Sequence, residues 1–387
     1  MKQVLLRGIT WNHSRALPPL IATAQRYEEL NPGVRIQWEK RSLHEFGHAD
    51  LATLAHHFDL LIIDHPMAGD AEAANILTDL LPLLSFEEIK DLRDDSLGPS
   101  FSSYLYQGKL YALPIDSAAP AASFRPDLFE RNGVKEPILW SDVVALARSG
   151  LVRMPAFSAD LFLNFLGLCV SRGSAVAASP EHLIDHEIGS LCLEQLDELA
   201  ALMPEEIYRM NPIAIYEQMS RGDNFAYCPF AYTYSNYSRN GFGAKHVRFS
   251  NPVALEKDLP MRTVLGGTGI AISAKCNEQV LALDYSLFVA GRSCQSTLYG
   301  MCGGQPARRS AWCDPLLNQI TDDFFLRTAA SIETAYVRPR YKGYVNLQER
   351  AGELIAEHCK HHGNPRRAIE EIDGLYRSSL KESTKYV

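Results

Sequence analysis

The chain has 387 residues, of which 46% are hydrophobic and 22% are charged, a composition typical of globular proteins and not of disordered or low-complexity ones. Its 38 lysines and arginines face 46 aspartates and glutamates, and the resulting net charge of −8 argues against nucleic acid as the main partner. The sequence contains no apolar run of about 18 residues, so we expect no membrane insertion, and its length suggests about two or three domains.

The first residues lack the pattern of a secretory leader. Val4, Leu5 and Leu6 form the only apolar run before Arg7, whereas a leader needs about 7–15 apolar residues. The chain as written is therefore expected to be cytoplasmic, or periplasmic if a leader has been removed. The cysteines are scattered and include no Cys-x-x-Cys pair, which favours buried free thiols in a reducing compartment.

The N-terminal region alternates between strand and helix patterns. Residues 2–10 predict a strand, 17–30 an amphipathic helix and 34–39 a second, alternating strand. Residues 42–58 have a helical pattern, and 59–64 form a continuous apolar run, as expected of a strand buried on both faces. This order of elements predicts βαβ units and a parallel sheet.

Residues 105–116 predict a hairpin with Gln107 and Gly108 at its turn, which runs into an extended Leu-Pro segment. From residue 119 to about 259 the pattern is rich in helices. The later elements that we expect are a strand at 225–230, a glycine-flanked strand at 265–273, a helix at 277–290 and a mostly helical C-terminal third.

Several segments carry a family-like pattern in a fixed order along the chain. They are residues 27–34 (YEELNPGV), 106–116 (YQGKLYALPID), 266–273 (GGTGIAIS), 304–310 (GQPARRS) and 336–341 (YVRPRY). Taken together they resemble the extracellular solute-binding protein family 1, the maltose-binding-protein-like binding proteins of ABC transporters. The resemblance covers nearly the whole chain, and its motifs are specific for fold but not for ligand.

The resemblance implies an α/β, two-lobed periplasmic-binding-protein-like fold of type II. Each lobe would be a mostly parallel sheet flanked by helices, and one ligand would lie between the lobes. The first lobe would comprise residues 1–113 and 262–310 and the second lobe 117–258 and 311–387. The hinge would lie near 113–118 and 259–265.

Candidate ligand-binding residues follow the predicted strands, because ligands of open α/β sheets bind at the carboxyl ends of strands. In the first lobe they are Trp11, Asn12, His13, Arg15, Asp64, His65, Asp116, Gly267 and Arg308, and in the second lobe Tyr232, Tyr234 and Asn236. Indole and phenol rings can stack on a sugar, and the polar groups can bind its hydroxyls. Each kind of candidate has a structural role as its alternative. The tryptophan could be packed for stability, the carboxylates could cap helices or turns, the tyrosines could form an aromatic core, the arginines could form salt bridges, and the glycine could make the crossing between the lobes flexible.

One motif points elsewhere. His44-Glu45-Phe46-Gly47-His48 matches the H-E-x-x-H pattern of zinc hydrolases, in which two histidines one helical turn apart bind the metal. Gly47 lowers helix propensity and no third ligand follows at the usual spacing, so we expect a scaffold role and neither metal nor cofactor. The sequence shows no recognised catalytic nucleophile motif.

These observations favour a binding protein that traps a small polar ligand, either sugar-like or a small carboxylate. If the chain is exported, its partner would be the permease of an ABC importer. The alternative is a cytoplasmic enzyme on the same fold, in which His13, Asp64, His65 and Asp116 would supply acid–base groups.

Overall fold

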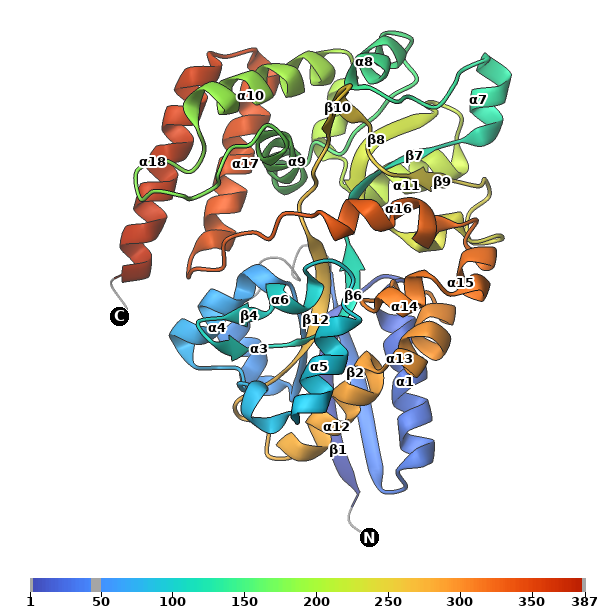
Figure 1. Cartoon of the computed structure of the whole chain (residues 1–387), viewed down its shortest axis with the longest axis vertical. Coiled ribbons are helices and arrows are strands. Elements are labelled where there is room, and N and C mark those ends of the chain that lie inside the picture. Colours follow the sequence, from blue (N-terminus) through green and yellow to red (C-terminus); the bar gives the residue numbers. More distant parts are fainter. Residues whose placement is uncertain (1–2, 43–49, 385–387) are drawn as a thin grey trace. The chain divides into compact units, whose positions relative to one another are not determined.

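The computed structural model describes residues 3–42 and 50–384 (Figure 1). The chain divides into two compact units. The first comprises Met1–Ala118, Gly266–Leu326 and Arg340–Val345, and the second comprises Ala119–Leu265, Arg327–Pro339 and Asn346–Val387. Whether the connections near 113–118 and 259–265 act as hinges stays a prediction.

The elements of the first unit are β1 (Val4–Trp11), α1 (Leu17–Leu30), β2 (Val34–Arg41), α3 (Leu51–His57), β3 (Leu60–Ile63), η1 (His65–Met67), α4 (Ala68–Ala74), η2 (Leu81–Leu83), α5 (Phe86–Asp94), α6 (Ser100–Ser103), β4 (Leu105–Tyr106), β5 (Lys109–Leu110), β6 (Leu113–Ala118), β12 (Gly266–Ile272), α12 (Gln279–Ala290), α13 (Arg292–Cys294), η5 (Gln295–Tyr299), α14 (Arg309–Trp312) and α15 (Pro315–Ile320).

The elements of the second unit are β7 (Pro120–Phe124), α7 (Pro126–Asn132), α8 (Trp140–Arg148), α9 (Ser158–Ser171), α10 (His186–Ala201), η3 (Glu205–Arg209), α11 (Pro212–Arg221), β8 (Tyr227–Tyr232), η4 (Ser235–Ser238), β9 (Arg248–Ser250), β10 (Ala254–Glu256), β11 (Leu259–Pro260) and α18 (Pro365–Thr384). The division between the units falls within α16 (Phe324–Glu333) and α17 (Tyr344–His361).

The first unit is built on a mixed sheet with strand order β2-β1-β3-β12-β6. β1 pairs in parallel with β2 and β3, which confirms the predicted βαβ arrangement, whereas β12 runs antiparallel to both β3 and β6. Leu60–Ile63 are completely buried, as the continuous apolar run predicted. Helix α1 packs against β2, and α12 packs against β6 and β12.

Local sequence signals set several boundaries in this unit. Helix α1 has the predicted bounds, and the tight turn of the hairpin places Gln107 and Gly108 at φ 48° and 79°, the left-handed conformation that such turns require. Within the predicted helical range 42–58, the structure describes α3, which begins after Asp50 because the Asp50 carboxylate caps it by accepting hydrogen bonds from Ala52 N and Thr53 N. The H-E-x-x-H motif at 44–48 lies outside the described residues.

The second unit corrects one expectation. Its main sheet has the order β8-β7-β9, and β7 pairs antiparallel with both neighbours, so this lobe is not built on a mostly parallel sheet. The segment that joins β7 to β8 contains α7 to α11 and is far longer than one βαβ crossover. Such a connection does not fix the direction in which the chain returns.

The cysteines are all free in the structure, as the sequence predicts, but Cys302 is half-buried and Cys313 is exposed. Among the described helices, none is long and apolar enough to cross a membrane.

Gly267 allows a test of whether the close approach of β12 to β6 contributes to stability. Its φ is +103°, and a Cβ atom would lie 2.3 Å from the Asp116 carbonyl oxygen. We expect Gly267→Ala to lower the free energy of unfolding by about 3 kcal/mol, through backbone strain and the clash together. Urea denaturation measures this.

Gly33→Ala is the matched control, because its φ is +106° but a Cβ atom there meets nothing within 4 Å. It retains only the conformational penalty, about 1 kcal/mol. Equal losses for the two variants would mean that the close approach of the strands is unimportant.

Candidate functional site

Most of the candidate residues in the first unit gather at one edge of its sheet. β1, β3 and β6 run in one direction and β12 runs in the other, so the carboxyl ends of the first three strands and the start of β12 lie at the same edge (Figure 1). The candidates at this edge are Trp11, Asn12, His13, Arg15, Asp64, His65, Asp116 and Gly267. Polar loops at such an edge are where open α/β sheets bind ligands.

A buried ion pair organises this edge. The Arg15 guanidinium faces the Asp116 carboxylate with both of its arms: Nε donates to Oδ2 at 2.8 Å, and Nη2 donates to Oδ1. The two side chains are 5% and 0% exposed. Burial raises the pKa of the Asp116 carboxyl, and the Arg15 charge and a hydrogen bond that the carboxylate accepts from the Gln305 backbone oppose that rise. Because each charge satisfies the other, this pair positions the loop after β1 on β6.

His13 is held in one tautomer by the same loop. Its Nδ1 accepts a hydrogen bond from Arg15 N at 2.9 Å, so in the neutral ring the proton is on Nε2. Burial lowers the pKa of His13 to about 4, and the neighbouring Arg15 charge adds to the effect. The ring is therefore a neutral hydrogen-bond donor near pH 7.

The remaining residues at this edge differ in accessibility. Asn12 is exposed, and Asp64 is half-buried with its Oδ1 accepting a hydrogen bond from His65 N at 2.8 Å. His65 is buried and packs edge-on against Tyr104. Trp11 is the last residue of β1 and is 4% exposed within the hydrophobic core, so the structure places it as a packed tryptophan with little face to offer.

Two first-unit candidates serve the scaffold. Gly267 allows β12 to approach Asp116 on β6, as described above. Arg308 is buried, and its guanidinium donates to the carbonyl oxygens of Ala290 and Asp91 at 2.7 and 2.6 Å. This guanidinium thus joins α12 to α5. The Asp91 carboxylate lies 2.9 Å from it, so Arg308 has the structural role that the sequence left as the alternative, that of a salt-bridged arginine.

Of the second-unit candidates, Tyr234 belongs to an aromatic cluster with Tyr216 and Tyr237. Tyr234 and Tyr237 are buried and lie beside Tyr216, with ring centroids 6.1 and 5.3 Å apart. Tyr232 is half-buried and donates its hydroxyl hydrogen to the Val264 carbonyl oxygen at 3.1 Å. Asn236 is 2% exposed, and its Oδ1 has no hydrogen-bond partner within the described part of the chain.

The sequence reading missed two polar positions. Thr268 on β12 is directly opposite Asp116, and its buried hydroxyl has no hydrogen-bond partner among the described residues. Asp160 lies in the first turn of the largely apolar helix α9, where burial raises the pKa of its carboxyl to about 7. Strand register could have pointed to Thr268, but Asp160 carries no local signal beyond being a lone acid in an apolar helix.

Comparison with known proteins identifies a family. A model of the family described as bacterial extracellular solute-binding protein matches residues 10–290. No curated protein matches the chain.

Solved structures show the same fold at low sequence identity. An ABC transporter solute-binding protein from Agrobacterium radiobacter, in complex with ribitol, is 19% identical, with a TM-score of 0.81 over 97% of this chain and 99% of that one. A solute-binding protein from Thermotoga lettingae bound to α-D-tagatose is 13% identical, with a TM-score of 0.81 over 98% and 100%. Maltose-bound MalE3 from T. maritima is 16% identical, with a TM-score of 0.78 over 97% and 99%. These likenesses establish the α/β solute-binding fold.

The buried ion pair predicts strong coupling between its two residues. Arg15→Met or Asp116→Leu alone leaves a buried charge without its partner and should cost about 3–5 kcal/mol of unfolding free energy. The double variant should cost clearly less than the sum of the two single variants, because no charge then remains buried. Urea denaturation of all four proteins measures the coupling, and additive losses would contradict a buried pair.

The lowered pKa of His13 predicts a pH dependence. Below about pH 6.5 the unfolded chain takes up a proton on this ring that the folded chain does not, so the free energy of unfolding falls as the pH drops toward 4. We expect this group to account for about 2 kcal/mol of that loss and for none above pH 6.5. His13→Asn should flatten the wild-type slope between pH 6.5 and 4, and an unchanged slope would show that the ring titrates normally.

Proposed function

The chain belongs to the family of bacterial extracellular solute-binding proteins, and on this premise we propose that it captures a small neutral polyhydroxylated solute, a sugar or a sugar alcohol. The observation that supports this ligand class best is that both arginines which the sequence suggested for an acidic ligand are bound by protein groups. An acidic ligand needs an arginine fork or another free cation. Arg15 and Arg308, which the sequence suggested for that role, are both engaged by protein groups.

The accessible polar groups at this edge suit hydroxyls. Asp64 is half-buried and acts as a hydrogen-bond acceptor, the neutral His13 ring donates from Nε2, and the exposed Asn12 amide can do both. The Asp64 carboxylate can accept charge-assisted hydrogen bonds from two vicinal hydroxyls of a solute. The carboxylate of an acidic ligand would instead be repelled by its negative charge. Asn12, His13 and Asp64 are therefore the proposed ligand contacts of the first unit, with Arg15 and Asp116 positioning them.

In the second unit Tyr232 is the proposed aromatic contact. It is half-buried, and its hydroxyl is anchored on Val264, which fixes the ring at the end of β8. A fixed ring can stack on the apolar face of a sugar at low entropic cost. Tyr234 and Asn236 are more deeply buried than Tyr232 and are less available to a ligand.

Ligand-bound structures of the similar proteins agree in ligand class. Their ligands, ribitol, α-D-tagatose and maltose, are neutral and rich in hydroxyls. As the family is extracellular, we propose that the chain delivers its solute to the permease of an ABC importer.

The acid–base alternative has less support. A general acid or base works best when its pKa is near the operating pH, whereas the pKa of His13 is lowered to about 4. Asp116, a second group of that alternative, is held by Arg15. Binding without chemistry fits these residues better.

The test is a calorimetric titration of the full chain with ribitol, mannitol, tagatose and maltose. Small dicarboxylates are titrated in the same way. We expect at least one polyol or sugar to bind and the dicarboxylates not to bind. Asp64→Asn should weaken that binding about tenfold, because a hydrogen bond to a charged group contributes about 1.5–3 kcal/mol. Small-angle scattering of the same samples reports whether the chain becomes more compact, as hinge closure predicts.

Asn277→Ala is the matched control. This exposed asparagine follows the opposite end of β12, so its loss should leave the affinity unchanged. Tight binding of a dicarboxylate, or equal effects of the two variants, would overturn the proposed ligand class and site.

A further inference from the structure

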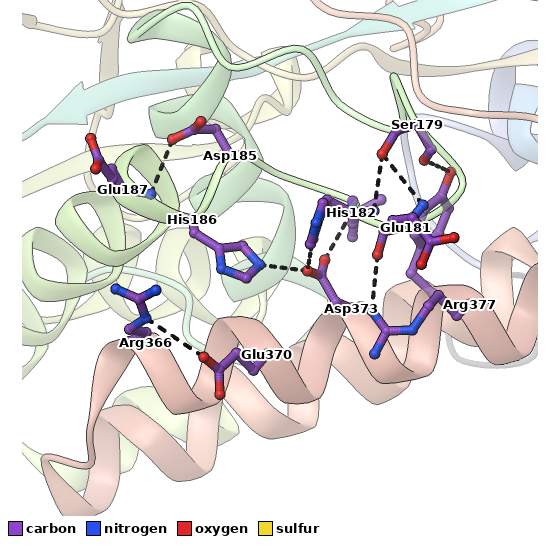
Figure 2. A network of polar contacts seen from close by, with 12 residues as sticks. Ser179, Glu181, His182, Asp185, His186, Glu187, Arg366, Glu370, Asp373 and Arg377 are labelled. Atoms are coloured by element: carbon purple, nitrogen blue, oxygen red, sulfur yellow. Dashed lines mark hydrogen bonds and ion pairs between the residues drawn. The ribbon is translucent and has the colours of Figure 1, made fainter.

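A second polar cluster lies within the second unit, away from the sheet edge discussed above. His182 comes from the segment ahead of α10, His186 is the first residue of α10, and Asp373 comes from α18 (Figure 2). Both imidazole rings point toward the Asp373 carboxylate from the side opposite its own helix. Within the described ranges these are the one group of histidine, cysteine or acidic side chains in which at least three ligand atoms lie close enough to hold a metal ion.

The three ligand atoms are close together. Asp373 Oδ2 is 2.6 Å from His182 Nδ1 and 2.7 Å from His186 Nε2, and all three atoms lie within 4.8 Å of one another. The Asp373 side chain is 2% exposed, whereas those of His186 and His182 are 27% and 55% exposed. The carboxylate is therefore at the bottom of the cluster, and the histidines are on its solvent side.

The orientation of the carboxylate is fixed independently of the histidines. Asp373 Oδ1 accepts a hydrogen bond from Leu183 N at 2.8 Å, which leaves Oδ2 directed at the two rings. The neighbouring guanidinium groups are engaged, because Arg377 donates to the Glu181 carbonyl oxygen and Arg366 pairs with Glu370 along α18 (Figure 2). Carboxylates that bind metals are usually held in this way, with one oxygen hydrogen-bonded to the protein and the other directed at the metal.

We propose that His182, His186 and Asp373 form a binding site for a divalent transition metal, with zinc as the best fit. Two imidazole nitrogens and one carboxylate oxygen are a zinc ligand set, and three protein ligands leave a fourth tetrahedral position for water. The exposure of His182 places that position on the solvent side. The site would join the segment ahead of α10 to α18, which are far apart in the sequence.

Binding requires only small movements. With bonds of about 2.0–2.1 Å, the ligand atoms around tetrahedral zinc are about 3.3 Å apart. The two nitrogen–oxygen distances would therefore have to open from 2.6 and 2.7 Å, which rotation of the partly exposed imidazole rings allows. The proton that each ring now donates to Asp373 moves to the other ring nitrogen or leaves to solvent, because the metal takes the lone pair.

The experiment uses the full chain without a histidine tag, stripped of metal with a chelator. Zinc alone is titrated by calorimetry, and cobalt(II) is titrated by visible absorption, in which tetrahedral coordination gives intense bands. We compare the wild type with His182→Asn, His186→Asn and the double variant. Since His182 is more than half exposed, its replacement should leave the fold intact, which circular dichroism checks.

His362→Ala is the matched control. His362 is also exposed and hydrogen-bonded to a carboxylate, Asp197, at 2.9 Å, but that pair is not part of a three-ligand group among the described residues. The histidines of the 44–48 motif are present in every variant, so a difference in zinc binding between the variants cannot come from them.

We expect the wild type and His362→Ala to bind one zinc ion that the double variant does not bind. Each single replacement should weaken this binding by about 100-fold or more. Zinc at 100 times its dissociation constant should raise the thermal midpoint by about 3 °C in the wild type and in His362→Ala, but not in the double variant. Equal stoichiometry and cobalt spectra in the wild type and the double variant would overturn the proposal and leave a hydrogen-bonded His-Asp-His cluster. The outcome is independent of the proposed solute.

Discussion

The ion pair between Arg15 and Asp116 links residues 101 positions apart and lies completely inside the first unit. It connects the loop that leaves β1 to β6, at the far side of the sheet from β2. A buried pair of this kind adds little net stability, because desolvation offsets the attraction, but it penalises every arrangement in which the two groups are apart. The positions of Asn12 and His13 depend on that constraint, since both lie in the same loop.

The same pair determines the chemistry that remains for a solute. It engages the guanidinium of the loop itself, and burial, with the Arg15 charge adding to it, lowers the pKa of His13 and keeps the ring neutral. The proposed contacts beside the pair are the Asp64 carboxylate, the neutral His13 imidazole and the Asn12 amide. These groups match hydroxyls and match anions poorly, so a structural constraint on one arginine becomes a preference for neutral polar solutes.

In the second unit a buried carboxylate again connects distant segments. Asp373 is separated from His182 by 191 positions and is fixed by hydrogen bonds from both histidines and from a backbone amide. Arg15 faces Asp116 with a guanidinium, which is not a metal ligand, whereas Asp373 faces two imidazole nitrogens, and these three ligand atoms lie within 4.8 Å of one another. Among the described residues, this geometry makes the second cluster the candidate for metal binding.

The sequence by itself determined the elements whose signals are local: the bounds of α1, the turn at Gln107 and Gly108, and the buried strand β3. Ordered motifs pointed to the family and fold, and strand ends located most of the candidate residues in the first unit. Tertiary structure alone decided that the second sheet is antiparallel, that Trp11 and Arg308 are packed inside, and that His182, His186 and Asp373 meet. Propensities and capping act over a few neighbouring residues, whereas burial and ion pairing depend on which distant segments the folded chain brings together.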